Sequence, residues 1–496
     1  MGRWSHPRWV AVVGLAGLVT WCAPLHAQDL LWSVDYGGNY AEEGFSVAAT
    51  SDSGFVVLGS TYSFGAGDHD LYVLRLDNSG DTLWSHTYGG SGTDYGYDIQ
   101  VTYDGGYILC GSTRSSGAGK ADVYLLKLNF LGGVVWSRTF GGPENDNARS
   151  VRQTPDGGFV LAGSTASFGA GYDDFWIIRT NASGDSLWSR TVGGTGGEAA
   201  FAVRPVPSGG YIATGATGSF GEGYSSIYAV RLDADGDTVW TNTYGGAQAD
   251  MAYSVENTPD GGFVFVGATA SFGAGEYDAY LVKTDPDGNQ EWDHRYGGTL
   301  ADRGYSVQPT TDGGYFIAGS TASYGSGGSD LLAIKTDPIG GQEWRRNYGG
   351  SKADYCQSAI ASNKSWVMVG YTFSYGAGSS DVYLTRIRGE QATPVDDLPD
   401  DLLPGAFVLE QNYPNPFNLG TTIRFELSAR ADISMSIYNI LGQTVWQHDA
   451  GILPAGEHDL YWDGYDRSGR EAATGVYFYA LTAGDVRQTR KMLLLK

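Results

Sequence analysis

Cysteine is scarce in this sequence, with three in 496 residues, and one of these, Cys22, lies in the N-terminal segment. The other two, Cys110 and Cys356, fall at different positions of an internal repeat. The chain therefore lacks the disulfide framework that stabilises many small secreted domains. We expect both residues to be small buried hydrophobic side chains.

Basic residues are also few, with 31 lysines and arginines against 55 acidic residues and a formal net charge of −24. This excess of negative charge disfavours contact with nucleic acid or with an anionic membrane, and we predict neither as a partner. The same balance fits a soluble surface protein that has no charged partner.

Long hydrophobic runs are missing apart from residues 10–22, which are too few to span a bilayer. The run follows Arg3 and Arg8 and precedes the small residue Ala27, a pattern typical of a secretory signal peptide, which we assign to residues 1–28. Its removal deletes two arginines and no acidic residue, which changes the charge from −24 to −26. A lipoprotein signal cut at Cys22 is the alternative, although Trp21 stands where that chemistry needs a small side chain.

Glycine is abundant, with 75 residues, and a tryptophan returns every 52 residues. The glycines follow no Gly-X-Y period and 13% of all residues are aromatic, so they indicate tight turns between β-strands rather than collagen or disorder. A fixed period of this kind is typical of a repeat architecture. The repeated tryptophans are Trp32, Trp84, Trp136, Trp188, Trp240, Trp292 and Trp344.

Each repeat contains four short apolar runs separated by turn residues, for example 97–101, 107–111, 123–128 and 134–139. Four antiparallel strands per repeat predict an all-β fold with a seven-bladed β-propeller over residues 29–388, in which each tryptophan fills a gap between blades. The array begins with a tryptophan strand and ends with a three-strand unit, so we expect this N-terminal strand to close blade seven. A β-solenoid is the alternative, but its repeats are shorter and its ends need distinct caps.

Residues 389–406 break the period and combine Pro394, Pro399 and Pro404 with four aspartates, which indicates a linker. Beyond it, residues 407–496 show short alternating strands with regular turns. This pattern predicts a second domain, a small immunoglobulin-like β-sandwich.

Seven consecutive residues open this second domain and carry a resemblance: Asn412, Tyr413, Pro414, Asn415, Pro416, Phe417 and Asn418. Together with later segments and Lys491, they resemble the C-terminal sorting domain of the type IX secretion system, and the stretch is also similar to the immunoglobulin-like domain of flagellar hook-capping proteins. The resemblance implies that the type IX machinery is a partner. It further implies export through the periplasm and across the outer membrane of a Gram-negative bacterium, to the cell surface or the medium, and it implies no catalytic activity.

Acidic residues recur at two positions of the repeat, and a base follows the second of them. The acids either cap turns or pair with the bases, or they form a ring of carboxylates that binds a glycan or a cation. The first series, our candidate ligand-binding ring, is Glu42, Asp94, Asp146, Glu198, Asp250, Asp302 and Asp354. The second series is Asp70, Asp122, Asp174, Asp278, Asp330 and Asp381, with Ser226 in the remaining repeat, and the bases are Arg75, Lys127, Arg179, Arg231, Lys283, Lys335 and Arg386.

Two turns, 233–237 and 285–289, resemble part of a calcium loop, but the equivalent turns at Asn129 and Asp337 lack the middle acid, so plain hairpin turns are the other interpretation. The histidines show no metal-ligand spacing, and we find neither a nucleophile elbow nor a phosphate loop. We therefore assign no catalytic residue, no metal site and no cofactor other than this calcium alternative.

The near-perfect symmetry and the sorting motif together favour a monomeric, non-enzymatic binding protein for a glycan or a surface protein. A secreted polysaccharide hydrolase or lyase on a propeller scaffold is the alternative. An enzyme would carry unpaired, pKa-shifted carboxylates in a pocket on one or two blades. Function should therefore be sought where the repeat fails.

Overall fold

The computed structural model describes residues 29–362 and 364–389, and then 407–409, 412–415, 417–418, 420–427, 430–439, 443–467, 469–483 and 486–495. All regular elements within these ranges are β-strands, in agreement with the predicted all-β fold. The predicted signal peptide, almost all of the predicted linker, and Pro416 of the sorting motif lie outside the described residues. No helix in the described part of the chain is long and apolar enough to cross a bilayer.

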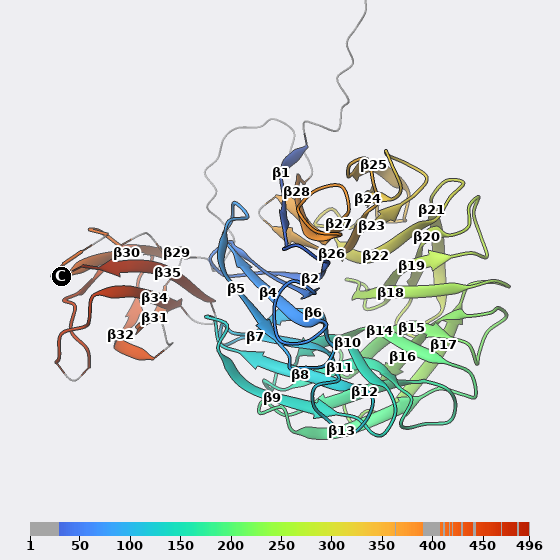
Figure 1. The fold of residues 1–496 in the computed structure, drawn as a ribbon, viewed down its shortest axis with the longest axis horizontal. Helices are drawn as coiled ribbons and strands as arrows, with labels where there is room; N and C mark the ends of the chain where they lie inside the picture. Colours follow the sequence, from blue (N-terminus) through green and yellow to red (C-terminus); the bar gives the residue numbers. More distant parts are fainter. Residues whose placement is uncertain are drawn as a thin grey trace, which may run out of the picture.

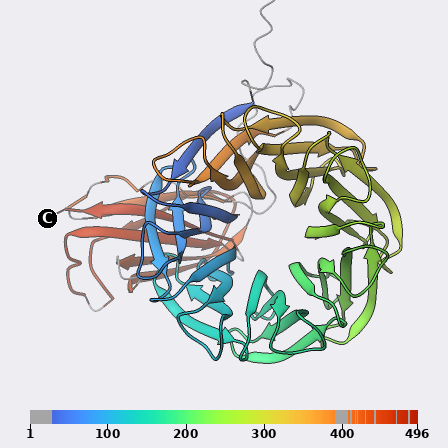
Figure 2. The same cartoon turned by 45° about the vertical axis from the view of Figure 1, so that its right-hand side comes forward.

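The strands of residues 29–388 form seven four-stranded antiparallel sheets around a central channel (Figures 1 and 2). Blade 1 contains β2 (Glu42–Ala49), β3 (Phe55–Thr61), β4 (Asp70–Leu76) and β5 (Thr82–Tyr88), and blade 2 contains β6 (Asp94–Val101), β7 (Tyr107–Thr113), β8 (Asp122–Leu128) and β9 (Val134–Phe140). Blade 3 contains β10 (Asp146–Gln153), β11 (Phe159–Thr165), β12 (Asp174–Thr180) and β13 (Ser186–Val192), and blade 4 contains β14 (Glu198–Pro205), β15 (Tyr211–Thr217), β16 (Ser226–Leu232) and β17 (Thr238–Tyr244).

The remaining three blades follow the same order. Blade 5 contains β18 (Asp250–Asn257), β19 (Phe263–Thr269), β20 (Asp278–Thr284) and β21 (Gln290–Tyr296), and blade 6 contains β22 (Asp302–Pro309), β23 (Tyr315–Thr321), β24 (Asp330–Thr336) and β25 (Gln342–Tyr348). Blade 7 combines β26 (Asp354–Ser362), β27 (Ser365–Thr372) and β28 (Asp381–Arg388) with β1 (Leu30–Tyr36).

Blade 7 joins the two ends of the propeller, because β1 pairs antiparallel with β28 (Figure 1). Trp32 lies opposite Arg386 in this pairing, and the amide of Arg388 donates a hydrogen bond of 2.7 Å to the carbonyl oxygen of Asp29. The carboxylate of Asp29 also forms an ion pair of 3.0 Å with Arg346 of blade 6. The predicted seven-bladed propeller, with its N-terminal strand closing blade 7, is confirmed.

Burial within a blade depends on the position of the strand. The two middle strands of blade 1, β3 and β4, are buried at every residue, because they are sandwiched between neighbouring blades. The outermost strand, β5, is exposed or half-buried throughout. Its tryptophan Trp84 reaches the next blade, where its ring centroid lies 6.1 Å from that of Tyr107. Trp32 makes the same contact with Phe55, so the tryptophans pack between blades as predicted.

A β-bulge interrupts the innermost strand of every blade at the same place. In blade 1 the register shifts between Gly44 and Ser46, which makes Phe45 the extra residue. The bulge brings the carbonyl oxygen of Glu43 so close to β3 that a Cβ on Gly59 would lie 2.2 Å from it. The other blades carry glycine at this position too, with the corresponding distance between 1.7 and 1.9 Å: Gly111, Gly163, Gly215, Gly267, Gly319 and Gly370.

The C-terminal domain is a sandwich of two sheets, as predicted. One sheet contains β29 (Phe407–Leu409), β30 (Thr421–Leu427) and β33 (Gly456–Trp462); the other contains β31 (Ala431–Asn439), β32 (Thr444–Leu453), β34 (Gly475–Ala483) and β35 (Val486–Leu494), in the order β32-β31-β34-β35. Phe425, Trp462 and Tyr479 are fully buried in the core that the two sheets share.

An aromatic side chain of the propeller, Phe130, contacts the C-terminal domain. Phe130 lies in the turn between β8 and β9, and its ring centroid is 5.5 Å from that of Tyr438 and 5.9 Å from that of Phe478 in the sandwich. The equivalent turns of blades 1 and 3 carry Asn78 and Ala182. Figure 1 accordingly shows the sandwich outside the ring, beside the first two blades.

Candidate functional site

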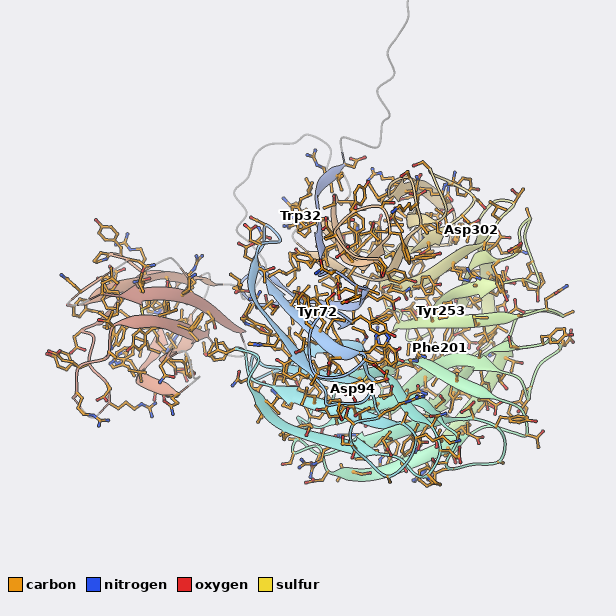
Figure 3. All side chains as sticks on the ribbon, viewed as in Figure 1. Trp32, Tyr72, Asp94, Phe201, Tyr253 and Asp302 are labelled. Carbon is orange, nitrogen blue, oxygen red and sulfur yellow. The ribbon has the colours of Figure 1, made fainter. Side chains whose placement is uncertain are left out.

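The seven carboxylates of the predicted ring lie at the start of the innermost strands and are buried within the blades. Each accepts a hydrogen bond of 2.6 to 2.8 Å from the amide of the glycine four residues earlier, as Glu42 does from Gly38. Glu42 also accepts a hydrogen bond of 2.7 Å from the hydroxyl of Thr61. Figure 3 labels two members of the ring, whose full set is Glu42, Asp94, Asp146, Glu198, Asp250, Asp302 and Asp354.

The second acid series caps the glycine-rich loops at the same end of the blades. Asp70 accepts hydrogen bonds from the amides of Ala66 and Gly67, at 2.8 and 3.0 Å. Thr61 lies opposite both Glu42 and Asp70 in the sheet, which places the two series side by side. Both series therefore hold turns in place. Ligand binding by the first ring stays a prediction, and a ligand would have to compete with these hydrogen bonds.

Five of the seven bases of the repeat form ion pairs at the opposite end of the blade. Arg75 is buried and pairs with Asp52, at 2.5 Å, in the turn between β2 and β3. Lys335 is fully buried and pairs with Asp312 in the corresponding turn, at 2.7 Å, and with Glu343. These five bases therefore bind the acids of the turns rather than either acid series, whereas Arg231 donates to the carbonyl oxygen of Gly209 and Arg386 donates to Asn78.

The two turns that resemble calcium loops are closed by their own backbone. The Oδ1 atom of Asp233 accepts hydrogen bonds from the amides of Asp235 and Asp237, at 3.0 and 2.9 Å, and Asp285 heads its turn in the same way. Within the residues that the structure describes, no three His, Cys, Asp or Glu side chains are placed to hold a metal ion. Cys110 and Cys356 are buried and unpaired, as expected.

The sevenfold symmetry fails in the central channel, which encloses a cavity of about 520 Å³. The innermost strands of all seven blades line this cavity, from the bulge to the strand ends such as Ala49 and Ala361. Those ends lead into the turns that hold the ion-paired bases, so the cavity lies on the side of the channel opposite the two acid series.

The bulge residues form an aromatic layer at the inner end of this cavity. The ring of Tyr253 lies 5.3 Å from that of Phe201 and 4.7 Å from that of Tyr305, and the guanidinium of Arg149 lies 3.9 Å from the centre of the Tyr97 ring. Figure 3 labels Phe201 and Tyr253 where β14 and β18 reach the centre of the ring. The layer consists of Phe45, Tyr97, Arg149, Phe201, Tyr253, Tyr305 and Gln357.

Two ion pairs lie in the cavity wall beyond this layer. Arg152 pairs with Asp98 at 2.5 Å, and Arg204 pairs with Glu256 at 2.6 Å. Burial and the neighbouring Arg204 lower the pKa of Arg152. Burial also acts to lower the pKa of Arg204, but the charge of Glu256 and its hydrogen bond outweigh this effect, and the pKa is raised.

The carboxylate of Asp98 is held by several further groups. It accepts hydrogen bonds from the hydroxyls of Ser46 and Ser150, at 3.0 and 3.2 Å, and from the amide of Val151 at 3.0 Å. Among the described residues that line the cavity, Asp98 and Glu256 are the acids, and both are paired with arginine. The lining thus combines flat aromatic surfaces with fixed charges and carries no unpaired carboxylate for acid–base chemistry.

Our sequence analysis did not single out these channel residues. The bulge shifts the alternation of side chains by one residue, so the period-two pattern does not show which side chains of the innermost strand face the channel. The repeat itself held the signal, because the positions 13 and 16 residues after each tryptophan change from blade to blade. The second of these positions holds Ala48, Gln100, Arg152, Arg204, Glu256, Gln308 and Ile360.

The predicted sorting motif lies along one edge of the sandwich, against β35. The amide of Asn412 donates to the hydroxyl of Tyr479 at 2.9 Å, the ring of Phe417 packs edge-on against Trp462 at 5.6 Å, and the Oδ1 atom of Asn415 accepts a hydrogen bond of 2.9 Å from the amide of Leu493. Asn412 and Phe417 are buried, whereas the exposed residues are Tyr413, Pro414, Asn415, Asn418 and, in β35, Lys491.

No curated protein matches the chain in sequence. Among solved structures, the chain is similar to the β-propeller domain of the Trilobed protease from Pyrococcus furiosus (9% identity, 72% of this chain and 97% of that chain, TM-score 0.38) and to the Pan2 WD40 domain of Neurospora crassa (9% identity, 71% and 91%, TM-score 0.43). It is also similar to Sqt1 from Chaetomium thermophilum (12% identity, 93% and 100%, TM-score 0.40). Residues 415–485 match the family model of the FlgD Ig-like domain, so the C-terminal sandwich is similar to that domain.

Proposed function

We propose that this chain is a non-enzymatic binding protein whose propeller takes up a segment of glycan in the channel cavity. The observation that carries this proposal is the asymmetry of the cavity: the blades share their acids and turns, but differ in the aromatic layer and in the wall that holds the two ion pairs. A scaffold has no need of such differences, whereas an asymmetric ligand does.

The chemistry of the lining supports a sugar as the ligand. Sugar rings stack on flat aromatic faces such as those of Phe201 and Tyr253, and arginine–carboxylate pairs present fixed donors and acceptors to hydroxyl groups. Hydrolysis of a glycosidic bond uses a pair of carboxyl groups as acid and base or nucleophile. Asp98 and Glu256 are engaged by Arg152 and Arg204, which favours binding over turnover.

The test is a glycan array probed with the full chain, followed by calorimetric titration of each hit and a reducing-sugar assay. Tyr253→Ala removes the centre of the aromatic layer, and we expect it to weaken binding at least tenfold, which corresponds to about 1.4 kcal/mol. Tyr224→Ala, at a residue that is 90% exposed, is the matched control and should bind normally. Release of reducing sugar would refute a non-enzymatic role and favour the polysaccharide hydrolase or lyase. If Tyr253→Ala binds glycan as tightly as the wild type, the cavity is not the binding site.

We further propose that the C-terminal domain directs export through a type IX secretion pathway, so that the propeller acts outside a Gram-negative cell or on its surface. The order of the motif residues from Asn412 to Asn418 and Lys491 supports this, as does the similarity of residues 415–485 to the FlgD Ig-like domain. In a host with that pathway, a chain truncated after residue 406 should remain in the periplasm while the full chain reaches the surface or the medium. Equal export of both chains would refute the proposal.

A further inference from the structure

A second departure from symmetry lies at the other end of the channel, around Glu43. Its neighbours in β2, Glu42 and Gly44, are buried in the blade, so the half-buried Glu43 side chain faces the channel. Among the described residues, no hydrogen bond or ion pair engages its carboxylate, in contrast to the acids of the repeat. Burial raises the pKa of this carboxyl group. The position holds another residue in every other blade: Tyr95, Asn147, Ala199, Met251, Arg303 and Tyr355.

Aromatic rings stand on the blade 2 side of this carboxylate. The ring of His69 lies 3.6 Å from that of Tyr62 and 4.6 Å from that of Tyr95. Burial is the main reason that the pKa of the Tyr95 phenol is raised, and the negative charge of Glu43 contributes to the rise. The Nδ1 atom of His69 is buried and has no hydrogen-bond partner. Burial also lowers the pKa of His69, which disfavours a positive charge on its ring.

A second group of rings stands on the blade 7 side. Tyr371 lies 5.0 Å from Tyr355 and 6.0 Å from Phe373, measured between ring centroids. Its pKa is raised by burial first and by the charge of Glu43 second. The backbones are also close, since a Cβ on Gly44 would lie 2.7 Å from the carbonyl oxygen of Gly370. Serine or alanine replaces Tyr371 in all other blades: Ser60, Ser112, Ser164, Ala216, Ala268 and Ser320.

We propose that Glu43 and the tyrosines on either side of it form a second binding site, at the loop end of the channel, which takes an alkylammonium group. A carboxylate without a protein cation attracts a positive charge, and the faces of tyrosine rings add cation–π attraction. Two arginines at this end of the channel do not fill this role: Arg114 forms no ion pair with Glu43 in the described structure, and Arg303 lies over the ring of Tyr277, 4.6 Å from its centre. The site is independent of the glycan cavity, which lies beyond the aromatic layer.

The experiment titrates the full chain with choline and with its neutral isostere 3,3-dimethylbutanol, using calorimetry or tyrosine fluorescence. We expect choline to bind and the neutral analogue to bind at least tenfold more weakly, because only the cation interacts with the carboxylate. Titrations with glucosamine and with lysine ethyl ester then compare two sources of the ammonium group. Glucosamine represents an amino sugar, and lysine ethyl ester represents a protein side chain.

Three variants make the result specific. Glu43→Gln removes the charge, and Tyr371→Ser introduces the residue that four other blades already carry, so its blade should fold. Both variants should lower choline affinity at least tenfold. Glu276→Gln, on an exposed glycine-rich loop at the same end, is the control and should bind normally. No choline binding by the wild type, equal binding of the neutral analogue, or unchanged affinity in both variants would overturn the proposal. Glycan titrations of the same variants should be unaffected, which separates this result from the test of the cavity.

Discussion

Single acidic residues divide into two groups in this protein. Those at the two recurring positions of the repeat accept hydrogen bonds from backbone amides, as Glu42 does from Gly38. Asp98 and Glu43 each occur in one blade only, and they face the channel. A turn that is built seven times needs the same cap seven times, whereas an asymmetric ligand needs residues that differ between blades. The repeat therefore separates acids that hold the same turn in many blades from acids whose role is specific to one blade.

Asp330 belongs to the first group, and it should make the stability of the propeller depend on pH. Burial raises its pKa to about 6, with a further contribution from the charge of Asp354. A carboxyl group with a raised pKa binds a proton more tightly in the folded state. Its stabilising contribution is therefore complete below the unfolded value of 3.8 and is lost as the pH rises through about 6. We expect the melting temperature to fall between pH 5 and pH 7.5.

The variant Asp330→Ser tests this directly, because blade 4 already has Ser226 at the same position. We expect a smaller change of melting temperature between pH 5 and pH 7.5 in calorimetric scans. Some dependence should remain, since burial also raises the pKa of Asp174, Asp278 and Asp381. The exposed Asp287→Asn is the control, and a pH profile of Asp330→Ser identical to wild type would contradict the expectation.

Asp98 should stabilise the channel by neutralising Arg152. Asp98→Ser introduces the residue found at this position in most blades, but leaves the Arg152 guanidinium without its carboxylate. Breaking one side of such a buried pair costs about 3 kcal/mol, measurable by urea denaturation. Adding Arg152→Ala should recover most of this loss while glycan binding stays impaired. A single variant as stable as wild type would show that solvent in the channel compensates for Asp98.

At the level of elements, the repeat predicted the number and order of strands but not their irregularities. The run 97–101 was predicted as a strand, and β6 extends from Asp94 to Val101 with a bulge at Tyr97. Hydrophobic alternation cannot reveal a bulge, because one extra residue reverses which face each later side chain occupies. The sequence does indicate each bulge indirectly, because the strand opposite it carries a glycine. The close carbonyl oxygen excludes a side chain at that position.

Gly163 tests the structural need for these glycines. In Gly163→Ala the Cβ would lie 1.9 Å from the carbonyl oxygen of Asn147 and 2.7 Å from the Cα of Ala148, so the strands must separate. We expect a loss of about 1 to 3 kcal/mol, typical of overpacking, and a lower melting temperature. Gly197→Ala, where a Cβ would have no atom within 4 Å, should melt like the wild type. Equal melting of the two variants would mean that the bulge can move aside.

The closing strand should have a larger effect than any single residue. Deleting residues 29–38 removes β1, leaves the edge of β28 without a partner, and removes the contact of Trp32 with Phe55. We expect the melting temperature of the chain without residues 1–28 to fall by many degrees on this further deletion. Unchanged melting would show that blade 7 is stable with three strands.

For the whole molecule, seven blades and a separate sandwich followed from counting repeats and from the change in composition after residue 388. The contact between the two domains did not, because no rule of periodicity relates one Phe130 in a turn to Tyr438 and Phe478 in another domain. The only sign was that the equivalent turn of blade 1 carries Asn78. The difference between blades at this turn was therefore the feature of the sequence that indicated the contact.

Phe130→Asn should release the sandwich from the propeller, since it removes the ring that contacts Tyr438 and Phe478 and introduces the residue of blade 1. We expect a larger radius of gyration in small-angle X-ray scattering with no change in the melting of the propeller. Tyr172→Asn, at an exposed loop residue of blade 3, is the control. Scattering identical to wild type would show that other contacts hold the sandwich.

The pairing of β1 with β28 also sets the order in which the propeller can be completed. β1 is the first strand of the propeller in the chain, and its partner is the last strand of the ring, so this pairing has the greatest sequence separation of any in the propeller. Contacts between distant segments form slowly, because the chain must first close a long loop. A growing chain therefore carries an unpaired β1 until residue 388 has emerged, and six blades can form before the seventh. The ring can therefore close only after the whole propeller has been synthesised.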